Sequence, residues 1–199
     1  METVKNVLLW FGVIGLAWYF MHGADHFLEL TRAAMGKYFD YRYVLILHIT
    51  AGGGALILGP PQFWAVFRKN RPKIHRIIGY LYCLAVLTSG TTAVVLAFTT
   101  AYKVNWAYAF SLQVWVSVWL ISTFAALIAA VKRKFKSHSE WMVRSYLSTL
   151  AFVISGLAIK LPFVVALGSF ADISPSLFWA AWAIPFYIYQ LILFYRARS

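Results

Sequence analysis

Long apolar runs separated by short polar segments dominate the chain from one end to the other. A run of about 18 apolar residues is long enough to cross a lipid bilayer as a helix. The runs predict six transmembrane helices, at about residues 7–21, 41–67, 77–102, 106–131, 141–168 and 177–195. Because these helices use nearly the whole chain, we expect one all-α domain over residues 1–199, a six-helix transmembrane bundle.

Two details refine this pattern. The first run has no small-residue cleavage site and leads into bulky residues 18–21, so we interpret it as a retained helix rather than a signal peptide. In the second run, Pro60 and Pro61 remove two backbone donors, so we expect a kink or an end of regular helix there.

Composition supports a membrane protein. The chain is 62% hydrophobic and only 12% charged, whereas a soluble domain typically carries about 25% charged residues. The single cysteine, Cys83, lies inside an apolar run, where we expect a small core residue. A chain with one cysteine cannot form an intramolecular disulfide.

The net charge of +12 is concentrated in a few segments. One loop holds Arg68, Lys69, Arg71, Lys73 and Arg76, another holds Lys132, Arg133, Lys134 and Lys136, and the tail holds Arg196 and Arg198. Basic loops resist translocation, so these segments and both termini are expected on the cytoplasmic side, against anionic lipid headgroups. The charge thus indicates topology and a lipid bilayer as partner, and argues against binding of nucleic acid.

Two histidines lie near the predicted inner ends of helices. His75 precedes the third helix and His138 precedes the fifth, at one expected level. Two imidazoles facing each other across a bundle can ligate one haem b iron axially, and Arg76 and Arg144 would then hold its propionates or another anion. The alternative is that both histidines are interfacial side chains in contact with headgroups.

Glycines follow two of the histidines by one helical turn. Gly79 follows His75, and Gly52 follows His48. A glycine at this spacing leaves bare surface beside the imidazole, where a flat macrocycle can lie. Glycines at close helix contacts give the same pattern.

A second candidate site lies toward the outer side. His48 and Lys160 are predicted at similar depth in the second and fifth helices, about 10 Å below the outer surface at 1.5 Å per residue. We expect them to line a cavity for a second cofactor or a quinone-like substrate. The alternative is that Lys160 extends to the interface while His48 bonds a neighbouring carbonyl.

His22 and His26 share one helical face, close to Asp25 and Glu29. This set is typical of a metal site on the outer surface. The alternative is a solvated amphipathic segment.

Three segments carry a resemblance to a known family. They are His48-Ile49 with Gly52 and Gly59-Pro60, His75-Arg76 with Gly79 and Tyr82, and His138 with Trp141-Met142, Arg144 and Tyr146. The set resembles the bacterial multi-pass membrane family called domain of unknown function 2306. The resemblance implies a membrane bundle in the bacterial inner (plasma) membrane.

The chain is also similar, more loosely, to two-haem transmembrane cytochromes of the b type. It departs from them because residues 106–131 contain no histidine. One inner haem is therefore easier to build than two.

From these observations we expect a b-type-cytochrome-like electron-transfer protein, with a transmembrane oxidoreductase as the corresponding enzyme class and a quinone or redox protein as partner. The alternative from another class is a small-molecule or proton-coupled transporter that uses His48 and Lys160. A third alternative is an accessory subunit of a larger membrane complex. A homodimer, in which the partner is a second copy of the chain, is the other assembly that the sequence leaves open.

Overall fold

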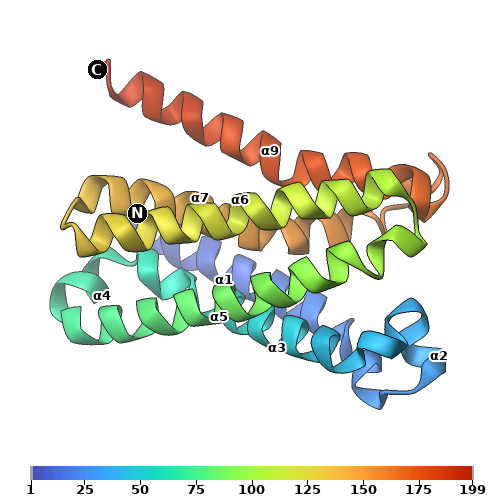
Figure 1. The fold of residues 1–199 in the computed structure, drawn as a ribbon. Coiled ribbons are helices and arrows are strands. Elements are labelled where there is room, and N and C mark those ends of the chain that lie inside the picture. Colours follow the sequence, from blue (N-terminus) through green and yellow to red (C-terminus); the bar gives the residue numbers. More distant parts are fainter. Residues whose placement is uncertain (1, 199) are drawn as a thin grey trace. The chain divides into compact units, whose positions relative to one another are not determined.

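The computed structural model describes the backbone of residues 2–198 and side chains from residue 10 onward (Figure 1). Every regular element in this part is a helix, which confirms the all-α prediction. The long helices are α1 (Glu2–His22), α3 (Arg42–Leu58), α5 (Pro72–Phe98), α6 (Trp106–Val131), α7 (Phe135–Ala158) and α9 (Phe170–Arg196). The short ones are η1 (Asp25–Glu29), α2 (Arg32–Met35), η2 (Gly36–Tyr41), η3 (Pro60–Phe63), α4 (Ala65–Asn70), η4 (Ala101–Lys103) and α8 (Pro162–Val165).

Five helical segments of the described part are long and apolar enough to cross a membrane. They are Arg32–Phe63, Pro72–Lys103, Trp106–Val131, Phe135–Ala158 and Phe170–Arg196. A sixth crossing would be α1, which has 21 residues. The side chains of residues 2–9 lie outside the described ones. The described part thus contains several candidate membrane-spanning helices, and the count of six stays a prediction.

Proline sets several helix ends. Regular helix α3 stops at Leu58, directly before Gly59 and Pro60, as the sequence predicts. Helix α5 begins at Pro72, earlier than the expected 77–102, because proline fits the first helical turn, where no backbone donor is needed.

The predicted helix over 141–168 has different bounds. It begins at Phe135 and ends at Ala158, and the short α8 starts at Pro162. Proline lacks a backbone donor and restricts the residue before it, so α7 does not continue through this position.

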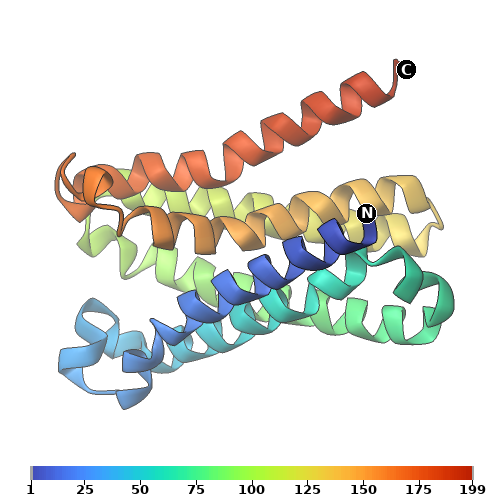
Figure 2. The ribbon, with the colours of Figure 1, turned by 180° about the vertical axis from the view of Figure 1, so that it is seen from behind.

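Helix α9 begins earlier than the predicted 177–195. Ser169 and Asp172 form a capping box: the Ser169 side chain accepts from the Asp172 backbone N–H, and the Asp172 side chain accepts from the Ser169 backbone N–H. Figures 1 and 2 show α9 bent partway along its length, and Pro185 lies inside the helix. Proline inside a helix removes one hydrogen bond and bends the axis.

The chain divides into two compact units, the first ending at Leu96 and the second beginning at Ala97. In the first unit α1 runs alongside α3 (Figure 2), and Met35, Leu45 and Leu96 form a buried cluster. The prediction of a single domain over 1–199 stays a prediction.

In the second unit α6, α7 and α9 pack together. Their shared core contains Trp115, Ala151 and Ala181, and the Trp115 ring stacks on Phe152 with centroids 4.0 Å apart. Asn105 caps α6 by accepting from the Tyr108 N–H at 2.7 Å, and its amide donates to the Ala171 carbonyl of α9 at 2.8 Å. The cap therefore also joins the starts of α6 and α9.

Candidate functional site

His48 is bound to the neighbouring helix of its own unit. Its Nδ1 lies 2.9 Å from the Ser89 carbonyl oxygen of α5 and 3.0 Å from Ser89 Oγ. The Ser89 hydroxyl donates to the His48 carbonyl at 3.0 Å. Because a carbonyl oxygen only accepts, the proton of the neutral ring sits on Nδ1 and the lone pair on Nε2. The arrangement is the one expected if His48 bonds a neighbouring carbonyl.

The two glycines lie at close contacts with protein atoms. A Cβ at Gly52 would lie 3.1 Å from Ser89 Oγ, and one at Gly79 would lie 3.3 Å from Gln62 Oε1. These contacts correspond to the helix-packing alternative. A role for Gly52 and Gly79 beside a macrocycle stays a prediction.

His75 lies in the first turn of α5, in the first unit, as a half-buried side chain. Its backbone N–H donates to the Arg71 carbonyl at 3.0 Å, and its ring Nδ1 is buried. The adjacent Arg76 is exposed.

His138 lies in the first turns of α7, in the second unit. Its Nδ1 donates to the Ala126 carbonyl of α6 at 2.9 Å. The bond fixes the ring against α6 and leaves the lone pair of the neutral ring on Nε2. His75 and His138 belong to different units, so their pairing on one iron stays a prediction.

Arg144 is directed toward α9. Its guanidinium donates to the Gln190 Oε1 at 2.8 Å and to the Glu140 carbonyl at 3.1 Å. Its Cζ also lies over the rings of Trp141 and Tyr189, at 4.9 and 5.2 Å from their centroids. His138 bonds α6 instead, so the described contacts do not place these two side chains at a common ligand.

Lys160 is an exposed residue in the turn between α7 and α8, where its N–H donates to the Leu157 carbonyl at 3.1 Å. The predicted depth assumed a helix running to residue 168. Since α7 ends at Ala158, the assumption of a continuous helix is wrong, and the depth of Lys160 stays a prediction.

The outer histidines have separate partners. His22 Nδ1 forms an ion pair with Asp25, whereas His26 Nδ1 donates to the Gly23 carbonyl at 3.1 Å. Among residues 10–198 no group of three or more His, Cys, Asp or Glu side chains is gathered as a metal site. The predicted metal site at His22 and His26 therefore gains no support.

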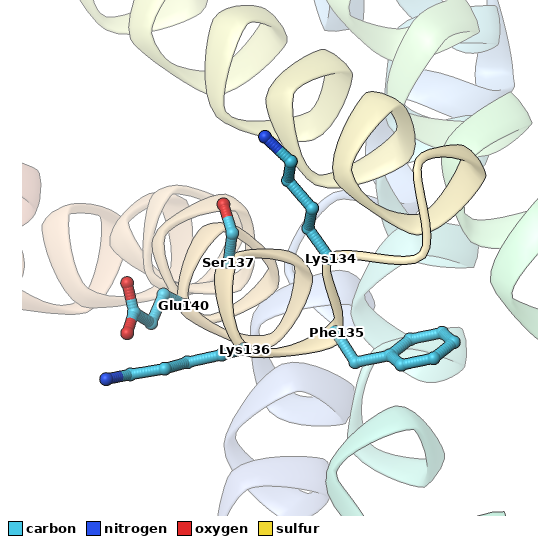
Figure 3. A pocket seen from close by; sticks show the side chains of 5 residues that line it. All are labelled: Lys134, Phe135, Lys136, Ser137 and Glu140. Carbon is cyan, nitrogen blue, oxygen red and sulfur yellow. The ribbon is translucent and has the colours of Figure 1, made fainter.

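An open hollow of about 440 Å³ lies at the turn between α6 and α7 (Figure 3). It is lined by Lys134, Phe135, Lys136, Ser137 and Glu140. Lys136 and Glu140 extend the same way in Figure 3, and Lys134 and Phe135 point elsewhere. Two cations and one carboxylate on an open surface do not make an enclosed binding site.

Sequence reasoning missed a polar seam between α6 and α7. The Trp119 indole donates to Thr149 Oγ1 at 3.0 Å, Thr149 Oγ1 donates to the Ser145 carbonyl at 3.1 Å, and the Ser145 and Thr123 hydroxyls are 2.7 Å apart. The signal was present as small polar residues at one-turn spacing along an apolar run.

Comparison with known proteins identifies a family. A family model described as "Predicted membrane protein (DUF2306)" covers residues 45–193, which is most of the chain. No curated protein and no solved structure matches. The chain therefore belongs to this family of predicted membrane proteins.

Proposed function

We propose that the protein is a membrane-embedded electron-transfer protein of the b-type-cytochrome kind, with His138 and His75 as candidate haem ligands. This proposal refines the membership in a family of membrane proteins, and it rests mainly on the environment of His138.

The bond from His138 Nδ1 to the Ala126 carbonyl is the observation that carries the proposal. Histidines that ligate metals usually donate their other ring N–H to a carbonyl or carboxylate, which fixes the tautomer and the ring orientation. His138 is half-buried, so its Nε2 is set up as a ligand on a restrained ring.

The ligand inventory favours haem over a metal held by protein atoms alone. Between residues 10 and 198 no three potential ligand side chains come together. Haem brings four nitrogen ligands of its own and asks the protein for one or two axial histidines. His75, at the start of α5 with a buried Nδ1, is the second axial candidate.

The transporter alternative has less support. Lys160 is exposed in a turn rather than placed within a membrane-spanning helix, and the His48 Nδ1 is engaged with Ser89. A protonatable pair of these two side chains is therefore not favoured by their positions.

An optical spectrum tests the proposal. The full chain is purified in detergent from haem-replete cells and measured air-oxidised and then dithionite-reduced. We expect a Soret band that shifts and sharpens on reduction, and its loss or displacement in His138→Ala and His75→Ala. His26→Ala is the control, because that imidazole bonds only locally at the surface. A colourless protein, or a spectrum unchanged in both variants, contradicts the proposal.

A further inference from the structure

The Arg144 guanidinium lies at the contact between α7 and α9, in the second unit. Two of its donors are used, by the Gln190 side chain and the Glu140 backbone. Trp141, three residues earlier on α7, and Tyr189, adjacent to Gln190 on α9, contact its faces. Four groups from two helices thus hold this side chain in one orientation.

Among the described side chains, no carboxylate lies within ion-pair distance of the Arg144 guanidinium, although Glu140 is one helical turn away on α7. Glu140 contributes its backbone carbonyl, and its carboxylate lines the open hollow (Figure 3). A charged side chain on a membrane-spanning helix is costly unless an opposite charge or polar groups compensate it. The Gln190 amide and one carbonyl supply only dipoles.

The guanidinium has further donors to offer. Arginine carries five N–H groups in a planar fork, and the described contacts use two of them. This fork matches two oxygens of a phosphate, to which it donates in parallel. A phosphate would supply both the missing negative charge and the missing acceptors.

The position of the cluster along its helices favours a lipid phosphate. Arg144 is about 12 Å along α7 from Lys136, and Tyr189 is about 10 Å along α9 from Arg196, at 1.5 Å per residue. Lys136 and Arg196 both belong to the strongly basic end of the unit, where the anionic headgroups are expected. Tryptophan and tyrosine, which flank the guanidinium, are the residues enriched between the hydrocarbon and the headgroups.

We propose that Arg144, oriented by Gln190 and flanked by Trp141 and Tyr189, binds the phosphate of an anionic phospholipid in the leaflet next to the basic loops. The site is separate from His138, which bonds α6, so it stands whether or not the protein binds haem. A lipid at this site would link α7 to α9.

Thermal unfolding of the full chain in a neutral detergent tests this site. The probes are phosphatidylglycerol, phosphatidylcholine and inorganic phosphate, each titrated while the unfolding midpoint is followed. The variants are Arg144→Gln, which removes the charge, Arg144→Lys, which keeps the charge without the fork, and Gln190→Leu, which removes the orienting amide. Arg198→Gln is the matched control, because it removes a cation from the same end of the unit. In the described structure the Arg198 guanidinium contacts only the Phe194 ring.

We expect phosphatidylglycerol to raise the midpoint of the wild-type chain more than phosphatidylcholine does. Its apparent affinity should fall about five- to tenfold in Arg144→Gln. Arg144→Lys and Gln190→Leu should weaken it by smaller factors, which keeps the test open if Arg144→Gln does not fold. Arg198→Gln should change it less than about twofold.

Three results would overturn the inference. Equal stabilisation by both lipids would show that net lipid charge is not recognised. Equal stabilisation by inorganic phosphate would assign the site to a free anion. Equal losses in Arg198→Gln and Arg144→Gln would show that lipid responds to overall charge rather than to this cluster.

Discussion

His48 and Ser89 exchange hydrogen bonds in both directions across the contact between α3 and α5. The imidazole Nδ1 donates to the Ser89 carbonyl at 2.9 Å, and the Ser89 hydroxyl donates to the His48 carbonyl at 3.0 Å. Gly52, one turn further along α3, lies against the same hydroxyl. The three residues therefore form one contact, in which a small residue allows close approach and two polar residues lock the position.

Ser89→Ala should destabilise the protein, because the variant removes the hydroxyl from a fully buried position. Hydrogen bonds between membrane helices contribute on average ~0.6 kcal/mol and at most ~1.7 kcal/mol, and we expect a loss toward the upper end. Unfolding in mixed micelles measures the loss. Ser117→Ala is the control, because its exposed hydroxyl bonds only the Gln113 carbonyl of its own helix. Equal effects of the two substitutions would mean that the pair adds nothing to stability.

Gly52→Ala tests the close approach itself. The added Cβ would lie 3.1 Å from Ser89 Oγ, which cannot shift without straining its bonds to His48. Overpacking of this kind costs ~1–3 kcal/mol, against a gain of up to ~1 kcal/mol from the better helix propensity of alanine. We expect net destabilisation in the same unfolding assay.

Gly12→Ala supplies the comparison for this prediction, since no described atom lies within 4 Å of a Cβ placed there. The substitution should be neutral or slightly stabilising. If Gly52→Ala behaved as Gly12→Ala does, the α3–α5 contact would have to be looser than the distances indicate.

How much of this could be foreseen differs between elements. The bounds of α6 follow directly from the sequence, because Asn105 caps its start and a basic segment ends its apolar run. The start of α7 does not follow, because hydropathy registers only apolar residues, whereas helical hydrogen bonds continue through the polar residues 135–140.

The candidate site divides in the same way. His48, His75 and His138 could be selected from sequence, because polar residues in or beside apolar runs are conspicuous. The partners Ser89 and Ala126 could not, because they depend on how α5 and α6 are rotated against their neighbours, which spacing along one helix does not determine. The turn at Lys160 does not follow from hydropathy, because the apolar run continues through Pro162, where a new short helix begins.

Thr149→Val tests the polar seam between α6 and α7. Thr149 is 2% exposed and accepts from the Trp119 indole at 3.0 Å. Valine keeps the shape but leaves a buried N–H without this acceptor, which costs about 1–3 kcal/mol. Thr91→Val is the control, because that exposed hydroxyl bonds only carbonyls of its own helix. Unfolding and the tryptophan emission spectrum should both change for Thr149→Val alone, and unchanged values would remove the seam as a stabilising feature.

Cysteine labelling tests the position of Lys160 and the crossing of α7 together. A 24-residue helix is about 36 Å long, enough to separate its two ends by the hydrocarbon layer. Cys83 is the only native cysteine, so Cys83→Ala gives a background without thiols. In that background Lys160→Cys should react with a membrane-impermeant maleimide on intact cells, whereas Lys134→Cys should react only after the membrane is opened. This result follows because Lys160 lies in the exposed turn after α7 and Lys134 directly precedes the helix.

If Lys160→Cys reacted only in opened membranes together with Lys134→Cys, the predicted orientation would be wrong or α7 would not cross. If it resisted reagent on both sides, the turn would be buried in lipid or protein, and a membrane-embedded role for Lys160 would regain its basis.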